Sequence, residues 1–154
     1  FATPSGKIEI ASERAEADGF PRLPQATVDE EPADGKLRLI SPAAEWLMNS
    51  SFGNDRRVIK IMGPATVTCH PETAFGLGIG DGDRVRLSNE LGELALTVCV
   101  SDMITPGALL VYKSRWPKME KSRANVNVLC IARKTDMGES TSVHATEVTV
   151  SRID

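Results

Sequence analysis

The chain has 154 residues, of which 41% are hydrophobic and 25% charged, so it is long enough for one globular domain with a sizeable core. Its formal net charge is only −3 and its Lys and Arg residues are scattered along the sequence, which excludes nucleic acid as the expected main partner. No apolar run approaches the roughly 18 residues that a membrane-spanning helix needs.

Residues 1–35 predict a tail or connector. Residues 7–10 alone have strand-like composition, and a DGFP sequence at 18–21 breaks the segment that follows. Residues 29–35 are acidic, polar and Pro-bearing, which is typical of a surface stretch or a crossing to another domain. Because the sequence begins with Phe1, we expect it to start inside a longer chain. We therefore predict a connector over 1–35 and one folded domain over 36–154.

Most of the remaining sequence predicts strands separated by turns and loops. In the clearest run, Leu94, Leu96 and Val98 alternate with smaller or polar residues, the period-2 pattern of a strand with one face on a core. Similar runs predict strands at residues 37–40, 65–69, 84–87, 94–100, 108–112, 127–131 and 147–151. Only one short helix is evident, so a closed barrel is the natural way to remove unpaired strand edges.

Turn and cap residues connect these strands. Pro71 fits the first turn of a short helix, which makes His70 a capping residue rather than a ligand or base. The DGD sequence at 81–83 predicts a turn in which Gly82 has a positive φ or a crowded contact. At the tight turn over 89–92, we expect Gly92 to adopt the positive φ of a bulged hairpin.

Two polar segments are candidates for ligand-binding loops. The first, at 41–54, is either a surface loop anchored by Trp46 and Phe52 or a loop whose amides and hydroxyls bind a ligand. The second, at 113–127, is too polar and irregular for a core, and loops of this length within compact domains are usually functional or disordered. Trp116 favours order in this segment. A further polar loop, at 135–142, precedes the last strand.

The residues indicate no catalytic centre and no metal site. Cys69, Cys99 and Cys130 are far apart and form no CxxC pair, so we interpret them as structural cysteines of a reducing compartment. The two histidines are also distant in sequence, and the carboxylates at 81 and 83 belong to a turn. Gly-rich phosphate-binding patterns and a GxSxG nucleophile motif are absent from the sequence.

A series of short motifs runs through nearly the whole chain. They are TPSGKIE at 3–9, LISP at 39–42, NSSFGN at 49–54, HPETA at 70–74, GIGDGDRVRL at 78–87, NELGE at 89–93, PG at 106–107, NVNVL at 125–129 and TDMG at 135–138. In their order and spacing, these motifs resemble the C-terminal molybdopterin-dinucleotide-binding domain of the molybdopterin oxidoreductase family, which includes dimethyl sulfoxide reductases, formate dehydrogenases and nitrate reductases. Two positions depart from the family pattern: His70 replaces the usual Asn or Asp, and Cys130 the usual Thr.

The resemblance implies a mainly β fold, a six-stranded double-psi β-barrel with one or a few short helices. It implies that the domain binds bis(molybdopterin guanine dinucleotide), with molybdenum or tungsten, inside a larger oxidoreductase. The other domains of that enzyme would be its partners and would supply the metal ligand, any iron–sulfur cluster and the redox chemistry. We therefore expect no catalytic residue and no metal ligand in this chain, and no activity from it in isolation.

The resemblance also assigns residues to the cofactor, because neutral Ser and Asn groups suit guanine, ribose and pterin edges. The assigned residues are Ser41, Pro42, Asn49, Ser50, Ser51, Ser114, Trp116, Asn125 and Asn127. Lys113 and Arg115 are candidate phosphate partners, with solvated surface as the alternative role for each.

Other classes of function stay open. A double-psi barrel can be a protein- or peptide-binding adaptor, as in the amino-terminal domains of some AAA ATPases, because function lies in the site rather than the fold. A decarboxylase-like barrel would need a self-processed Ser and catalytic partners that the sequence does not show. The TPSGKIE and NVN sequences favour the oxidoreductase domain. We expect a bacterial protein in the cytoplasm, with the periplasm as the alternative because a signal peptide would lie outside the sequence.

Overall fold

The computed structural model describes residues 1–26, 30–135, 139–141 and 144–153, so residues 136–138 of the TDMG motif lie outside the described residues. The chain divides into two units, Phe1–Glu30 and Glu31–Asp154. The first unit contains one short helix, α1 (Glu13–Ala17), which the side chain of Ser12 caps. Residues 7–10 form no strand, since no other described segment of this unit pairs with them.

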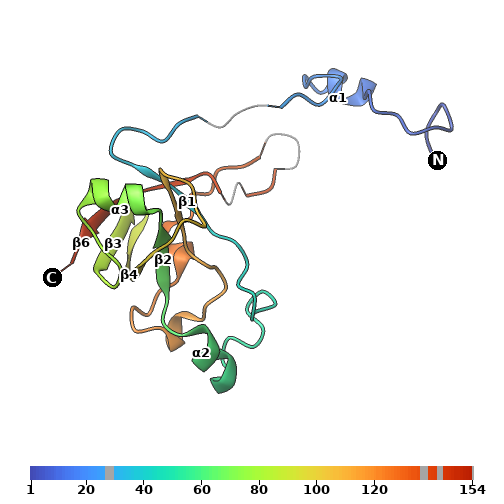
Figure 1. Ribbon diagram of the computed structural model, residues 1–154. Coiled ribbons are helices and arrows are strands. Elements are labelled where there is room, and N and C mark those ends of the chain that lie inside the picture. The colour runs from blue at the N-terminus through green and yellow to red at the C-terminus, as the bar shows by residue number, and fades with distance from the viewer. Residues whose placement is uncertain (27–29, 136–138, 142–143, 154) are drawn as a thin grey trace. The chain divides into compact units, whose positions relative to one another are not determined.

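The second unit is built on a closed barrel of six strands (Figure 1). The strands are β1 (Leu37–Ile40), β2 (Thr66–Cys69), β3 (Arg84–Asn89), β4 (Gly92–Val100), β5 (Ala108–Leu110) and β6 (Thr146–Arg152). Their order around the barrel is β1–β5–β2–β4–β3–β6, and β6 pairs back to β1. The pairs β1–β5 and β2–β4 are parallel and the other pairs antiparallel. The predicted mainly β fold, a six-stranded double-psi barrel with a few short helices, is confirmed.

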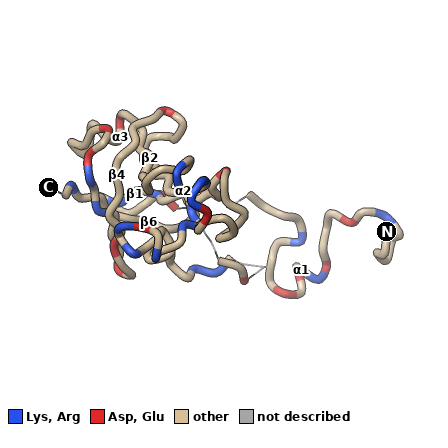
Figure 2. The backbone as a smooth tube through the Cα atoms, turned by 90° about the horizontal axis from the view of Figure 1, so that it is seen from below, with Lys and Arg blue, Asp and Glu red and all other residues tan. Residues whose placement is uncertain are grey.

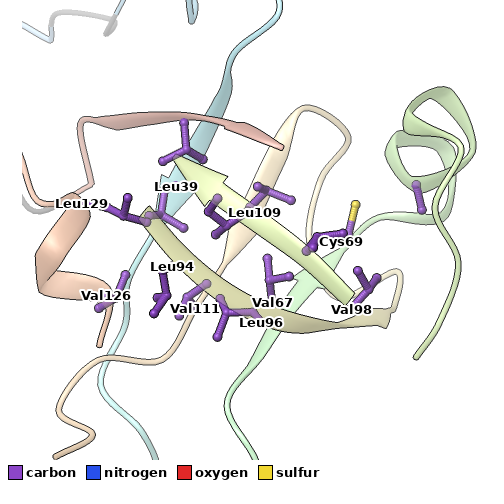
Figure 3. Packing of buried hydrophobic residues seen from close by; sticks show 14 residues of the cluster. Leu39, Val67, Cys69, Leu94, Leu96, Val98, Leu109, Val111, Val126 and Leu129 are labelled. Atoms are coloured by element: carbon purple, nitrogen blue, oxygen red, sulfur yellow. The ribbon is translucent and has the colours of Figure 1, made fainter. Parts of the chain in front are cut away.

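Aliphatic side chains from all six strands fill the barrel. Leu39 on β1, Val67 on β2 and Leu109 on β5 are each 1% exposed. On β4, alternate residues face inward as the sequence predicts. Figure 3 shows these side chains converging in one cluster. Burying a side chain of this size stabilises a fold by about 1.5–3 kcal/mol relative to leaving it exposed.

Helix α3 (Pro71–Leu77) follows β2 directly. As predicted, Pro71 lies in the first helical turn and His70 is the N-cap, with its Nδ1 accepting a hydrogen bond from the Glu72 amide at 3.1 Å. Gly78 ends the helix in the left-handed conformation. His70 is therefore confirmed as a structural residue.

The predicted strand at 127–131 is wrong. Residues Val126–Leu129 instead form a 3₁₀ helix, η2, which the side chain of Asn125 caps. Val126 and Leu129 point from η2 into the barrel cluster (Figure 3) and are 5% and 0% exposed. Residues three apart lie on the same side of a 3₁₀ helix, so Val126 and Leu129 share one buried face, although in sequence the segment resembles a strand.

Gly92, in the hairpin between β3 and β4, also differs from its prediction. It does not have a positive φ. Instead, a Cβ at this position would lie 2.9 Å from the carbonyl oxygen of Val128 in η2. The nearby Asn89 side chain donates from Nδ2 to the Leu129 carbonyl oxygen at 2.7 Å. Glycine is therefore needed here for close approach of η2 and not for the turn itself.

Helix α2 (Arg56–Met62) was not predicted, and a 3₁₀ helix, η1 (Pro117–Met119), lies in the second polar loop. α2 begins at Asp55, whose carboxylate accepts hydrogen bonds from the amides of Val58 and Arg57, which lower the pKa of this carboxyl. In Figure 1, α2 and α3 lie on different sides of the barrel. Among the described residues, no helix is both long and apolar enough to cross a membrane.

Gly82 provides a test of the turn before β3. Its φ is +83°, and among the described residues no heavy atom lies within 4 Å of the position of an added Cβ. Gly82→Val therefore introduces backbone strain without crowding. It should lower the free energy of unfolding by about 1–3 kcal/mol, measured by urea denaturation. Gly82→Asn is the matched control and should lose less, since asparagine tolerates the left-handed region. Equal stability of wild type and Gly82→Val would contradict this account.

Candidate functional site

One pocket on the second unit, of about 420 Å³, gathers residues from separate parts of the sequence. Its lining residues are Asn49, Ser50, Lys113, Ser114, Arg115, Trp116, Pro117, Asn125 and Asn127. All of them except Lys113, Arg115 and Pro117 belong to the set that the sequence assigned to a ligand. The two polar loops predicted at 41–54 and 113–127 therefore meet on one face of the barrel.

The other three assigned residues, Ser41, Pro42 and Ser51, are not among the residues that line this pocket. Ser41 lines an adjacent cavity of about 40 Å³, which shares Lys113 and Asn127 with the pocket. The Pro42 carbonyl oxygen accepts a hydrogen bond from the Lys113 amide at 3.0 Å. Ser51 forms an isolated bridge within the first loop and is exposed. Ser41 and Pro42 therefore lie next to the pocket, and Ser51 follows the lining residue Ser50 in sequence.

The first loop is anchored differently from the prediction. Trp46 and Phe52 do not anchor it, because they are 49% and 57% exposed. Ala44 and Leu47 are buried instead, at 8% and 7% exposed. Asn49 has a φ of 52°, in the left-handed region that asparagine adopts more readily than most residues. The buried pair fixes the base of the loop, and the turn at Asn49 follows directly.

Trp116 joins the first loop to the second. Its indole Nε1 donates to the Ser50 carbonyl oxygen at 2.6 Å. Gly53 permits this approach, since a Cβ there would lie 2.5 Å from the indole Cδ1. The Lys118 ammonium lies 4.8 Å from the centroid of the indole ring, within cation–π range. Trp116 therefore forms a wall of the pocket and holds the two loops together.

Arg115 is not solvated surface, which was one of the two roles considered from the sequence; the other, a phosphate partner, stays a prediction. Its side chain is 13% exposed, and its Nη1 lies 3.0 Å from Oε1 of Glu120. The guanidinium also donates to carbonyl oxygens just after α2, those of Gly63 at 3.0 Å and Pro64 at 3.2 Å. Oxygen atoms of the chain itself thus compensate its charge.

Lys113 remains available to a ligand. It lines both the pocket and the adjacent cavity. Its ammonium forms no ion pair or hydrogen bond with any residue that the structure describes. The following residue, Ser114, has a φ of 76°, a strained conformation for a residue other than glycine. The second loop therefore turns sharply where it presents its cation.

Asn125 and Asn127 have different roles. Both ends of the Asn125 amide are used within the chain: Nδ2 donates to the Arg115 carbonyl oxygen at 2.7 Å, and Oδ1 accepts from the Asn127 amide at 3.0 Å. The Asn127 side chain is exposed and makes no hydrogen bond with the described residues, so its donor and acceptor are open to a ligand. Asn125 shapes the pocket, and Asn127 faces it.

The pocket lies in a basic part of an acidic chain. Residues 55–64, which include α2, and residues 113–123 together carry eight Lys and Arg residues against two acidic residues. The hydrogen bonds of Arg115 bring these two segments together. Figure 2 shows the basic stretches at α2. The basic residues of these two segments thus come from separate parts of the sequence, and a basic cluster of this kind attracts an anionic ligand.

The described residues contain no group of three or more His, Cys, Asp or Glu side chains that could hold a metal ion. The cysteines are free, and burial in the barrel core raises the pKa of the Cys69 thiol. His144 accepts a hydrogen bond at Nδ1 from the Ser41 amide at 3.4 Å. The arrangement of open amides, one free cation and an indole wall suits the binding of a polar, anionic ligand that carries planar rings.

Comparison with known proteins agrees with this chemistry. A family model described as "Molydopterin dinucleotide binding domain" matches residues 37–147. "Probable oxidoreductase YoaE" of Bacillus subtilis is 31% identical over 98% of this chain and 22% of its own length. The dimethyl sulfoxide/trimethylamine N-oxide reductase of Cereibacter sphaeroides is 29% identical over 75% of this chain and 15% of its own length. The chain thus spans about a fifth of the curated relatives it matches.

Among solved structures, acetylene hydratase from Pelobacter acetylenicus is similar in fold, with a TM-score of 0.74. The match covers 99% of this chain and 24% of that protein, at 18% identity. At this identity the likeness concerns the fold, and it extends over both units of the chain.

The contact between Gly53 and Trp116 can be tested directly. Gly53→Ala should displace the indole, because the new Cβ would lie 2.5 Å from Cδ1. We expect a loss of about 1–3 kcal/mol in the free energy of unfolding, as for other overpacked sites. In a Trp46→Phe background, the emission of Trp116 should also shift to longer wavelength. Gly76→Ala is the control, since its Cβ would meet no described atom within 4 Å. Unchanged emission in Gly53→Ala would refute the contact.

Proposed function

The chain belongs to the Molydopterin dinucleotide binding domain family, and on this basis we propose that its pocket holds the nucleotide end of a molybdopterin dinucleotide cofactor. One observation carries the proposal. Two polar loops far apart in sequence form a single pocket, which presents the free ammonium of Lys113 and the open amide of Asn127. The described residues thus offer a cation and neutral hydrogen-bonding groups in one place.

We propose bis(molybdopterin guanine dinucleotide) as the form of the cofactor, because each part of a guanine dinucleotide has a partner in this lining. The side-chain amides of Asn49 and Asn127 provide donors and acceptors for guanine or ribose edges. The indole of Trp116 provides an aromatic surface for a planar ring. Lys113 provides a positive charge for the diphosphate.

Two other polar residues of the lining, Asn125 and Arg115, support the site instead of contacting the cofactor. The amide of Asn125 and the guanidinium of Arg115 make their hydrogen bonds within the chain. A ligand could use these groups only after their bonds within the chain were broken. The new bonds to the ligand would then replace the broken ones without a net gain in binding free energy. We therefore assign Asn49, Lys113, Trp116 and Asn127 to the cofactor itself.

We propose that the chain is the C-terminal domain of a larger oxidoreductase, with residues 1–35 as the connector from its preceding part. The curated relatives, several of them named as sulfoxide or N-oxide reductases, are about five to seven times as long as the part matched here, which covers 22%, 15% and 21% of three of them. When bound, the cofactor would supply a molybdenum or tungsten centre for redox chemistry. The other domains would hold that centre, any iron–sulfur cluster and the substrate. The free cysteines support a cytoplasmic location.

An adaptor function is the less favoured candidate. A docking surface for a peptide has no need of two loops that converge on a free cation and open amides. The family match over residues 37–147 also includes most of the residues that line the pocket.

Asn127→Leu tests the assignment to the cofactor. The Asn127 side chain is exposed and bonded to no described residue, so its loss should leave the barrel intact. In the full-length enzyme, the substitution should lower the guanine nucleotide released per mole of acid-denatured protein by about tenfold, the effect of one lost hydrogen bond to a ligand with an unpaired partner. Ser151→Leu, at an exposed position on β6, is the control. Full cofactor content in Asn127→Leu, with unchanged stability, would remove Asn127 from the site.

The isolated chain should be folded but inactive. Its barrel has its own closed core, whereas its described residues offer no cluster of metal ligands. Elemental analysis of the purified chain should find no stoichiometric molybdenum, tungsten or iron, and assays with dye acceptors should show no redox activity. Stoichiometric metal bound through His70, His144 or a cysteine would contradict this expectation.

A further inference from the structure

Arg115 connects three segments of the chain at the pocket. Its guanidinium donates to carbonyl oxygens at the end of α2, at 3.0 Å to Gly63 and 3.4 Å to Met62. The same group bonds the carboxylate of Glu120, which follows η1 and is 16% exposed. Its backbone carbonyl oxygen accepts the Asn125 side chain at 2.7 Å. One residue therefore ties together α2, η1 and the start of η2.

These bonds lead to the groups that face the ligand. Arg115 lies between Ser114, whose φ is 76°, and Trp116, whose indole bonds the first loop. Through Asn125 it also reaches Asn127, since the Oδ1 atom of Asn125 accepts the Asn127 amide. The direction of each ligand-facing group thus depends on where Arg115 is held. If the loop were flexible, it would lose conformational entropy when the ligand binds, and this loss would weaken binding.

We propose that Arg115 is a positioning residue, locked by Glu120 and by the carbonyl oxygens that end α2, and that this lock preorganises the pocket for its nucleotide. The inference rests on the proposed function and concerns the same site. Arginine suits the role because its planar fork can bond several oxygens at once, which the single ammonium of lysine cannot do. The pair is also largely removed from water, at 13% and 16% exposed, so removing one partner would leave a buried charge uncompensated.

A positioning residue and a phosphate-binding residue affect the binding of different ligands. A residue that contacts phosphate raises the affinity for GDP and not for guanosine, which has no phosphate. A residue that orders the pocket raises the affinity for both, because both need Asn127 and Trp116 in place. Lys113 and Arg115 are two residues apart, yet they should fall into these two classes.

The experiment is a titration of the 154-residue chain with GDP and with guanosine, followed by NMR or calorimetry below the unfolding temperature. Arg115→Lys should weaken both ligands by about tenfold, the effect of re-ordering one or two side chains on binding. Glu120→Gln keeps the size of the side chain but removes its charge. It should weaken the binding of GDP and guanosine by the same factor, which should be smaller than the factor for Arg115→Lys. Lys113→Met should weaken GDP alone.

A second ion pair provides matched controls. Arg86 and Glu93 pair at 3.3 Å on the outside of the β3–β4 hairpin and are 46% and 64% exposed. Arg86→Lys and Glu93→Gln repeat the same chemical changes away from the pocket. They should leave both affinities unchanged. Gly82→Val, which strains a turn outside the pocket lining, shows how much affinity is lost through general destabilisation alone.

Hydrogen exchange gives a readout that needs no ligand. The Asn127 amide bonds the Oδ1 atom of Asn125, so Arg115→Lys and Glu120→Gln should each speed its exchange relative to amides in β4. Unchanged Asn127 exchange in folded variants would overturn the proposal. Loss of GDP binding alone in Arg115→Lys would overturn it too, by making Arg115 a phosphate ligand. If Arg115→Lys does not fold, Glu120→Gln decides by the same criteria. If the wild type binds neither ligand, the proposed function fails, while the exchange measurement still decides whether the lock exists.

Discussion

The parallel pairing of β1 with β5 determines where the site is built. Neighbouring parallel strands end at the same edge of a sheet, so the segments that follow them start side by side. Ile40 pairs with Leu110 at the ends of these strands, and the hydrogen bonds continue beyond them, from the Val111 amide to Ile40 and from the Lys113 amide to Pro42. The two polar loops meet because of this pairing, although most of the barrel lies between them in sequence.

The site separates the groups that recognise a ligand from the groups that hold its shape. Asn127 and Lys113 are open, whereas Asn125 and Arg115 are occupied by the chain itself. Each open group has a supporting group of similar chemistry two positions away. Composition alone therefore does not distinguish an amide or a cation that binds from one that supports. Hydrogen-bond partners and burial make the distinction.

Sequence alone predicted the elements whose pattern is local. Alternation gave β4, and Pro71 with His70 gave the start of α3, because strand faces and helix caps depend on adjacent residues. The 3₁₀ helix at Val126–Leu129 was missed because its apolar residues fit a short strand equally well. α2 was missed although Asp55 is a recognisable cap, because its seven residues bury no side chain and so lack an apolar period.

Within the site, the lining residues could be assigned by resemblance, but their roles could not. The hydrogen bonds that hold Arg115 go to carbonyl oxygens of residues 62–64, which are far from it in sequence. Glycine is needed at position 92 because a carbonyl group of η2 lies close to it. Such contacts exist only once the barrel has closed. The basic character of the pocket has the same origin, because it arises where residues 55–64 and 113–123, two basic segments far apart in sequence, are brought together by the hydrogen bonds of Arg115.

The position of β6 has a consequence for how the protein is made. β6 pairs with β1 on one side and β3 on the other, so the first and last strands of the barrel are neighbours. During synthesis, β1 and β3 emerge long before β6, and each then exposes an unpaired edge. Pairings between such distant segments also form slowly, since a long stretch of chain must be ordered first. The nascent barrel is thus open and prone to associate with other chains until residues 146–152 leave the ribosome.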